Sequence, residues 1–236
     1  MISTSTPLEI VWSKLPEDYV LPNEPVDNIN QPSLAAALTE SLQLAGWLSE
    51  TAITATNYGI CATVNGKIVV KAPHWMYVPE IKVDRSEIVR SYTPNLQGEK
   101  PLLVLEFLSD TEGGEFSAKQ TYPPGKFFYY EKIVQVPNYG VFDPNSGNLE
   151  VYKLTGSGNY ELEKPQTENR CWIAQMGLYL GVWQGTRENR QGYWLRWWDD
   201  QNNMLLWGSQ IIAQERQKSE KLAAKLRELG IDPELI

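Results

Sequence analysis

The chain has 236 residues, of which 42% are hydrophobic and 21% are charged, and its formal net charge is −8 at pH 7. This composition is typical of a globular protein with one substantial core. The acidic balance argues against a protein that coats nucleic acid nonspecifically, because such binding depends on many Lys and Arg side chains. It leaves room for a local basic cleft. Every apolar stretch is shorter than the roughly 18 residues that a membrane helix needs, so no membrane partner is expected.

The N-terminal segment, Met1 to Pro7, has neither the basic part nor the apolar part of a secretion signal, which predicts a cytoplasmic protein. Cys61 and Cys171 are far apart in the sequence and lack the CxxC spacing of a zinc site. Both stand in apolar, strand-like surroundings. We therefore expect two buried free thiols rather than a disulfide or a metal site.

Three parts can be distinguished along the chain. Residues 1–32 are rich in Pro and show little periodicity, which predicts an irregular N-terminal arm. Residues 33–208 carry the strand and helix patterns of the main domain. Residues 209–236 are predicted as a C-terminal amphipathic helix, with Leu222, Leu226 and Leu229 on one stripe and a stop at Gly230.

The first half of the main domain begins with a helix and continues with a hairpin. Ser33 can cap a helix that ends at Gly46-Trp47. Two strands, residues 59–64 and 67–71, flank Asn65-Gly66, which supplies the positive φ angles of a type I′ turn. Pro73 is expected to end the second strand and to place His74 just past it.

The second half alternates strands with a helix. Residues 102–105 form a continuous apolar run that predicts a buried strand, and Glu106 follows at its end. Pro124 is expected in the first turn of a helix that extends to about Val134. Further strands are predicted at residues 139–142 and 148–154, and Trp-rich stretches at residues 178–183 and 193–198 predict a second hairpin. The order of elements indicates a mixed α/β fold.

These motifs together resemble the PD-(D/E)XK nuclease superfamily, and within it the Uma-two-like restriction endonucleases. The resemblance depends on the Asn-Gly hairpin before Ala72-Pro73, the Leu-Glu-Phe-Leu-Ser strand end, the Val-Phe-Asp-Pro hairpin, the Trp-rich hairpin and the closing Leu-Gly-Ile-Asp-Pro. It implies a restriction-endonuclease-like fold, in which a mixed central sheet is flanked by helices.

The resemblance also implies a site. Members of the superfamily hydrolyse phosphodiesters with one or two divalent metal ions, held by an Asp after the hairpin proline and a Glu at the end of the next strand, while a Lys orients the attacking water. Glu106 matches the Glu and is expected to be a catalytic metal ligand. Leu108 stands where the simple E-x-K pattern has its Lys. Lys126 keeps the family spacing of four residues to Tyr130, and Lys119 is the competing candidate.

His74 stands where the family has its Asp, and it is the only histidine in the chain. Mg²⁺ prefers oxygen ligands, whereas a neutral imidazole suits zinc, nickel or iron. His74 is therefore expected to weaken binding of Mg²⁺, the cofactor that the resemblance implies, and another divalent metal is an alternative. Glu40, on the first helix, is a candidate supporting carboxylate.

Each of these residues also has a structural interpretation. Glu106 could pair with a structural cation, His74 could be a hydrogen-bonded edge residue, Lys126 could be solvated, and the Trp residues fit a core or an interface better than a base-stacking surface. Two functions therefore stay open. One is a metal-dependent endonuclease-like hydrolase with an altered, weakened site that acts on DNA. The other is a non-catalytic nucleic-acid-binding or protein-interaction module. A homodimer is expected in either case.

Overall fold

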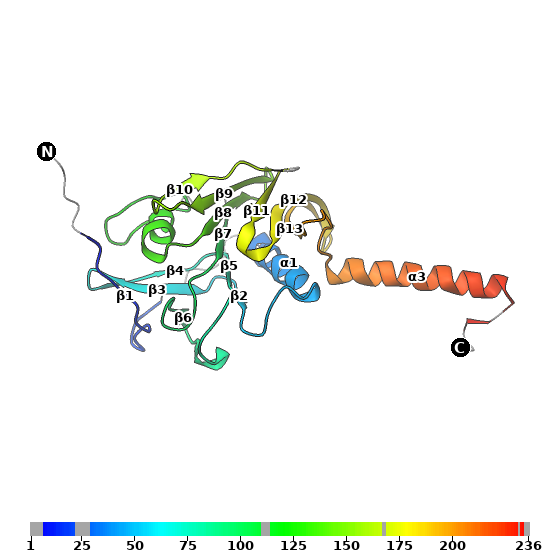
Figure 1. Ribbon diagram of the computed structural model, residues 1–236, viewed down its shortest axis with the longest axis horizontal. Helices are drawn as coiled ribbons and strands as arrows, with labels where there is room; N and C mark the ends of the chain where they lie inside the picture. The colour runs from blue at the N-terminus through cyan, green and yellow to red at the C-terminus, as the bar shows by residue number, and fades with distance from the viewer. Residues whose placement is uncertain (1–6, 22–28, 110–113, 167–168, 231, 234–236) are drawn as a thin grey trace.

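Three β-sheets and three α-helices make up the body of the protein in the computed structural model, which describes residues 7–21, 29–109, 114–166, 169–230 and 232–233 (Figure 1). The central sheet has six strands in the order β10-β9-β8-β7-β5-β2. Because β7 and β8 run parallel while the other neighbours run antiparallel, the sheet is mixed, as predicted. Its strands are β2 (Ile53–Ala55), β5 (Trp75–Val78), β7 (Leu103–Phe107), β8 (Asn138–Asp143), β9 (Asn148–Leu154) and β10 (Tyr160–Leu162).

The predicted Asn-Gly hairpin belongs to a second sheet, built from β1 (Ile10–Val11), β3 (Gly59–Val64), β4 (Lys67–Lys71) and β6 (Ser91–Tyr92). Asn65 and Gly66 have φ angles of 49° and 73°, so the turn conformation is confirmed. The expectation of a wholly irregular N-terminal arm is wrong in one respect, because β1 pairs with β3. Residues 1–6 and 22–28 of that arm lie outside the described residues.

The Trp-rich stretches form the predicted hairpin in a third sheet of β11 (Arg170–Ile173), β12 (Leu178–Arg187) and β13 (Arg190–Trp198). The turn is shorter than expected: it consists of Glu188 and Asn189, whose φ angles are 52° and 60°. The sheet buries a group that we call the Trp cluster, in which the guanidinium of Arg196 lies over the rings of Trp183 and Trp207 and Trp207 contacts Trp194. Arg196, Trp194 and Trp207 are almost fully buried, so these tryptophans are core residues.

Helix α1 (Asn30–Leu44) packs beside the third sheet (Figure 1). It begins three residues before Ser33, so the predicted start is wrong. Pro32 is tolerated in the first turn because the first N–H groups of a helix have no intrahelical acceptor. The Ser33 hydroxyl donates to Glu188 across the structure, at 2.7 Å, instead of capping the helix. Gly46, with φ 76°, follows the end of the helix.

The predicted helix after Pro124 is present in an unusual form. Gly125 is the N-cap of α2 (Lys126–Phe128), which continues directly into the π-helix η2 (Tyr129–Val134). Pro124 therefore precedes the helix instead of lying in its first turn. Two short 3₁₀ helices, η1 (Arg85–Glu87) and η3 (Ala174–Met176), lie in connections where the sequence predicted none. π-helical turns are rare and are found frequently at functional sites.

Two apolar cores cover the two faces of the central sheet, and β7 contributes to both by alternation. Leu103, Leu105 and Phe107 point into the core shared with α1 and the third sheet. Val104 points into the core shared with η2 and the β3–β4 hairpin. Since neighbouring side chains on a strand face opposite ways, Glu106 lies on the same face as Val104, below the α2–η2 helix.

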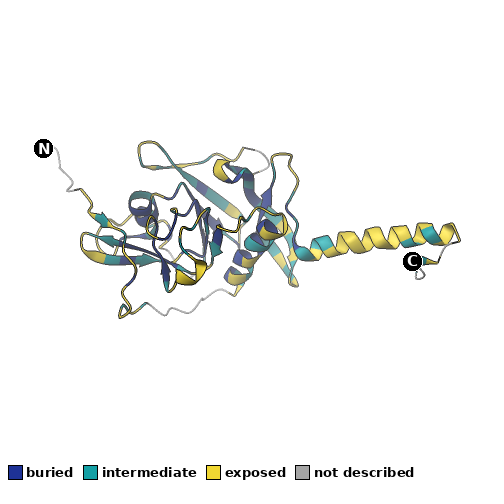
Figure 2. Ribbon diagram, turned by 60° about the horizontal axis from the view of Figure 1, so that its bottom comes forward, coloured by how far each residue is buried: buried dark blue, intermediate teal, exposed yellow. Residues whose placement is uncertain are grey.

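Helix α3 (Gly208–Glu228) extends away from the body, and Figure 2 shows it largely exposed along its length. No residue of α3 is buried, and Leu222 and Leu229 are exposed. The predicted stop at Gly230 is confirmed by its φ angle of 75°. In the described part of the chain, no helix is both long enough and apolar enough to cross a membrane. Cys61 and Cys171 are buried free thiols, as expected.

Candidate functional site

Strand pairing brings His74 and Glu106 together. Strand β5 pairs antiparallel with β7, and Trp75 is opposite Leu105, which places the preceding His74 opposite Glu106. His74 lies just past the hairpin strand β4, as predicted. The chain leaves the second sheet after Lys71 and enters the central sheet at Trp75, so His74 stands at the beginning of a new strand. The expected neighbourhood of His74 and Glu106 is nonetheless present.

The carboxylate of Glu106 is fully buried and surrounded by polar groups. Its Oε2 lies 2.7 Å from Nδ1 of His74 and 3.1 Å from Nζ of Lys126, while the Tyr130 hydroxyl donates to Oε1 at 3.3 Å. Burial raises the pKa of Glu106, but the close contact with His74 and the positive charge of Lys126 outweigh it, and the net pKa is lowered. Glu106 is therefore ionised at neutral pH.

The imidazole of His74 is held from two sides. Its ring stacks on Phe107 with 5.6 Å between ring centroids, and the Phe107 backbone N–H donates to Nδ1 at 2.9 Å. The contact with Glu106 uses the same nitrogen. Since one ring nitrogen either accepts or donates, the His74 tautomer decides which contact is a hydrogen bond. Only 5% of His74 is exposed, so it is not a surface histidine.

Lys126 is the lysine that the fold brings to Glu106. It is the first residue of α2, and its side chain keeps 20% of its surface exposed, more than any other side chain of the site. Lys119 is exposed in the preceding loop, where its carbonyl accepts a hydrogen bond from the Gly125 N–H at 2.9 Å. Proximity to Glu106 thus favours Lys126, at the spacing to Tyr130 that the family pattern has.

Glu115 is a site residue that the sequence analysis missed. It lies in the loop before α2, 1% of its surface is exposed, and its Oε1 is 3.8 Å from Nζ of Lys126. Neither carboxylate oxygen has a hydrogen-bond partner. The Tyr139 hydroxyl donates to the Glu115 backbone carbonyl at 2.8 Å. No local pattern signals this burial, because it depends on a contact with β8, 24 residues further along the chain.

Two buried tyrosines complete the wall of the site. Burial, followed by the nearby charge of Glu106, raises the pKa of Tyr130 and of Tyr139 well above the usual value. The Glu115 charge adds to the effect on Tyr139. Both phenols are therefore neutral hydrogen-bond donors across the physiological pH range, and neither can act as a base at neutral pH.

Helix α1 reaches the site through Gln31, whose side-chain amide donates to the Phe107 carbonyl at 3.3 Å. Glu40, the predicted supporting carboxylate, makes its contacts in another part of the structure. It pairs with Arg187 of β12 at 2.6 Å and accepts from the Gly208 N–H at 3.0 Å, which ties α1 to the third sheet and to the start of α3. These contacts give Glu40 a structural role and do not place it beside Glu106.

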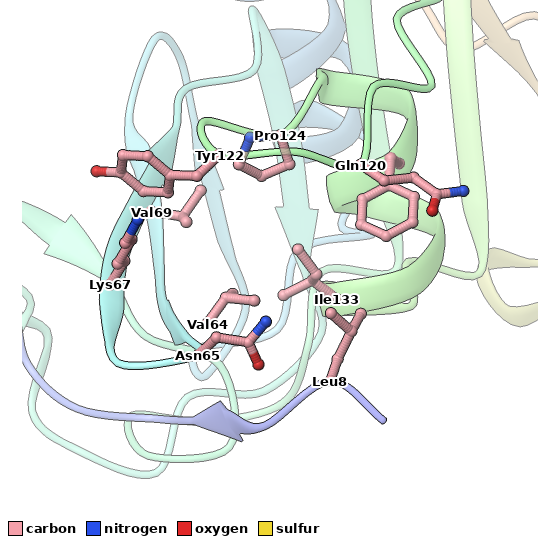
Figure 3. A pocket seen from close by; sticks show the side chains of 10 residues that line it. Leu8, Val64, Asn65, Lys67, Val69, Gln120, Tyr122, Pro124 and Ile133 are labelled. Carbon is pink, nitrogen blue, oxygen red and sulfur yellow. The ribbon is translucent and has the colours of Figure 1, made fainter. Parts of the chain in front are cut away.

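Two hollows are lined by residues other than His74, Glu106, Glu115 and Lys126. A pocket of about 130 Å³ is enclosed by the β3–β4 hairpin, the loop before α2 and η2 (Figure 3), with Lys67 stacked over Tyr122 at its rim. It is smaller than the roughly 300–1,000 Å³ of typical ligand pockets. A wider cleft of about 630 Å³ runs along α1 and β2 to Gly208, and Glu40 is among its lining residues.

The mixed sheet, the Glu at the end of β7 and the Lys of the following helix define a restriction-endonuclease-like α/β protein. Residues 34–187 match the model of the Uma2 family, described as a putative restriction endonuclease. The match spans well over half of the chain, and the protein belongs to this family. No curated protein matches the chain. Family membership indicates a nuclease-like function with DNA as the substrate class.

Restriction-endonuclease-like proteins generally use divalent metals, so we compared the donor atoms with that requirement. Within the described ranges, no group of three or more His, Cys, Asp or Glu residues is arranged to hold a metal ion. Mg²⁺, however, is usually bound by one or two carboxylates together with waters and substrate phosphates. The buried Glu106 and Glu115, whose carboxylate oxygens have no hydrogen-bond partner, meet that lower requirement, and the donor set fits a hard divalent ion.

Proposed function

We propose that the protein is a metal-dependent, endonuclease-like phosphodiester hydrolase with DNA as its substrate, in which the His74 substitution weakens the centre. The observation that carries this proposal is the 3.1 Å contact between Nζ of Lys126 and Oε2 of the fully buried Glu106, next to His74 at the family's Asp position. The proposed cofactor is Mg²⁺, with another divalent metal as the alternative.

In this proposal the residues have distinct tasks. Glu106 holds the metal, which when bound would acidify a water and neutralise charge on the phosphate. Lys126 presents a cation at the mouth of the site, where it orients the attacking water or stabilises the negative charge that develops on the phosphate. Tyr130 positions the Glu106 carboxylate through its hydroxyl. The buried aromatic wall keeps bulk water away from these charges and so strengthens their interactions.

His74 sets the level of activity. An imidazole in place of a carboxylate removes an oxygen ligand and one negative charge, both of which favour Mg²⁺. We therefore expect cleavage of plasmid DNA by the native chain to be weak or absent in MgCl₂, and His74→Asp to increase it. Glu106→Ala in the His74→Asp background is the control and should abolish the gain. Failure of His74→Asp to cleave under any divalent metal would contradict the proposal.

The alternative function is a non-catalytic module that binds nucleic acid or another protein on the same fold. It is favoured by the loss of the Asp at His74 and by the net charge of −8. Binding and cleavage of DNA by the native chain and by His74→Asp distinguish the two functions. If both proteins bind DNA and neither cleaves it, the non-catalytic module is favoured. Robust native cleavage that Glu106→Ala abolishes and that His74→Asp leaves unchanged would show that the substitution is harmless.

We further propose a homodimer in the cytoplasm. The support comes from α3, which has no buried residue and exposes Leu222 and Leu229 on one stripe. Closed two-fold pairing is the commonest oligomeric form, and a duplex has two strands to cut. A cytoplasmic location fits the free thiols of Cys61 and Cys171, which stay reduced there.

A further inference from the structure

We propose that Glu115 is a ligand of a divalent metal ion at the candidate site, and that it supplies the second carboxylate that His74 does not provide. The inference deepens the proposed function, because it concerns the metal at the same centre. Glu115 comes from the loop before α2 and not from the strand end where the family has its Asp.

The first argument is the burial of Glu115. Its surface is 1% exposed, and neither of its carboxylate oxygens has a hydrogen-bond partner. An ionised carboxylate taken out of water is costly unless it is paired or coordinates a metal, and unsatisfied buried polar groups are rare in native proteins. Lys126 forms an ion pair with Glu115 at 3.8 Å, but the same ammonium forms a shorter ion pair, at 3.1 Å, with Glu106.

The second argument is position. Both carboxylates lie within ion-pair distance of one ammonium, so they face a common space that already attracts a cation. Two carboxylates, completed by waters and phosphate oxygens, are a usual protein contribution to Mg²⁺ binding.

The third argument is that the loop holds Glu115 in place before any ligand binds. The Tyr139 hydroxyl fixes the Glu115 carbonyl, and Tyr139 is opposite Val104 in the parallel β7–β8 pair. Downstream, the Gly125 backbone packs so closely against Ser117 that a Cβ atom at Gly125 would lie 2.1 Å from the Ser117 carbonyl oxygen. A backbone held at Glu115 and at Ser117 is the preorganisation that metal ligands require.

Isothermal titration of the full chain with MgCl₂ and with MnCl₂ tests the assignment without any need for activity. Glu115→Gln should lower the affinity at least about tenfold, because even loss of a group that only orients a ligand costs 10- to 100-fold. Glu106→Gln should lower it as well. The matched control is Glu161→Gln, which replaces an exposed glutamate on β10 of the same sheet and should leave the affinity unchanged.

Two further variants locate the ion. Lys126→Met removes the ammonium that competes for the same carboxylates, so the metal affinity should rise. Melting temperatures give the second readout. In EDTA, Glu115→Gln should melt at or above the native temperature, because it removes a buried charge whose carboxylate oxygens accept no hydrogen bond. Addition of MgCl₂ should raise its melting temperature by less than it raises that of the native chain. If Glu115→Gln folds and shows these two melting temperatures, Glu115 is a metal ligand and not a carboxylate with a structural role alone.

Three results would overturn the assignment. Unchanged affinity in Glu115→Gln with reduced affinity in Glu106→Gln would leave Glu106 as the ligand and remove Glu115 from the site. Unchanged affinity in Lys126→Met would place the ion elsewhere. Absence of Mg²⁺ and Mn²⁺ binding by the native chain at millimolar concentrations would remove this metal site, whereas the proposed function is judged separately by DNA cleavage with His74→Asp.

Discussion

The candidate site and the Trp cluster both bury charged side chains, but they use the charges differently. In the Trp cluster, the fully buried Arg196 lies 3.5 Å from the ring centroid of Trp207 and donates to the Leu205 carbonyl at 2.6 Å. Two of its nitrogens lack hydrogen-bond acceptors, and aromatic faces take their place. Burial, with the nearby charge of Arg187, lowers the pKa of Arg196 to about 9.

The candidate site has no comparable compensation for Glu115. Its carboxylate oxygens lack hydrogen-bond partners, and the cation nearest to them is shared with Glu106. The Arg196 side chain is therefore part of the packing of the third sheet, whereas we propose that the carboxylates of the site bind a ligand. Substitutions in the first region should change stability, and substitutions in the second should change binding and activity more than stability.

The largest effect is expected for Trp207→Ala. The indole stacks on Arg196 and donates to the Ala37 carbonyl at 3.2 Å. The substitution therefore leaves a cavity in the core and removes the aromatic ring that covers the Arg196 guanidinium. Urea unfolding should show a loss of about 3–5 kcal/mol in the free energy of unfolding. Trp47→Ala, at a more exposed position, should cost clearly less. Equal costs for the two would contradict the role given to the Trp cluster.

Gly125→Ala is expected to have an intermediate effect. Its new Cβ would meet the Ser117 carbonyl oxygen at 2.1 Å, so the loop that carries Glu115 must move. We expect a loss of about 1–3 kcal/mol in chemical unfolding, together with weaker Mg²⁺ binding. Gly156→Ala is the matched control, because nothing lies within 4 Å of a Cβ there. If both variants bind Mg²⁺ like the native chain, the loop does not position a metal ligand.

A smaller, pH-dependent effect is expected for Glu106→Gln. The folded protein lowers the pKa of Glu106 below its ordinary value of 4.5, through His74 and Lys126 against the opposing effect of burial. The carboxylate therefore adds stability above about pH 4.5, and this contribution is lost as the pH falls through the lowered pKa. The difference in unfolding free energy between the native chain and Glu106→Gln should shrink with acidification. A difference that grows on acidification would mean that the pKa is raised.

The smallest change in stability is expected on α3. Leu222→Gln with Leu229→Gln removes exposed leucines, so the free energy of unfolding of a monomer should change by less than about 0.5 kcal/mol for each substitution. Light scattering at tens of micromolar should nevertheless show the native chain as a dimer and the double variant as a monomer. A monomeric native chain would reject the dimer, and a dimeric variant would point to another surface.

Much of the fold was predictable because its signals are local. Asn65-Gly66 sets its own turn, and the apolar run before Glu106 specifies a buried strand through composition alone. The start of the first helix, expected at Ser33, was predicted incorrectly because tertiary contacts decided it, and the new strand after His74 was not predicted. Ser33 bonds to a distant hairpin turn, and the chain changes sheets at His74, which no pattern within a few residues can encode.

The candidate site was only half predictable for the same reason. Glu106 and His74 could be located from strand ends and a proline, but the choice between Lys119 and Lys126 depended on how the intervening loop folds. Glu115 gave no signal, since a glutamate in a Gly-rich loop is ordinarily solvated. Its backbone is held by Tyr139 of β8, whose hydroxyl donates to the Glu115 carbonyl.

The most direct test of the account is a crystal structure of the native chain soaked in MnCl₂, with anomalous scattering to locate the metal. The account predicts a Mn²⁺ peak at about 2.0–2.3 Å from a Glu106 carboxylate oxygen, with Lys126 displaced from its present contact. A well-ordered site with no anomalous peak at Glu106, at a Mn²⁺ concentration that occupies other sites, would contradict the claim that this is a metal-dependent centre.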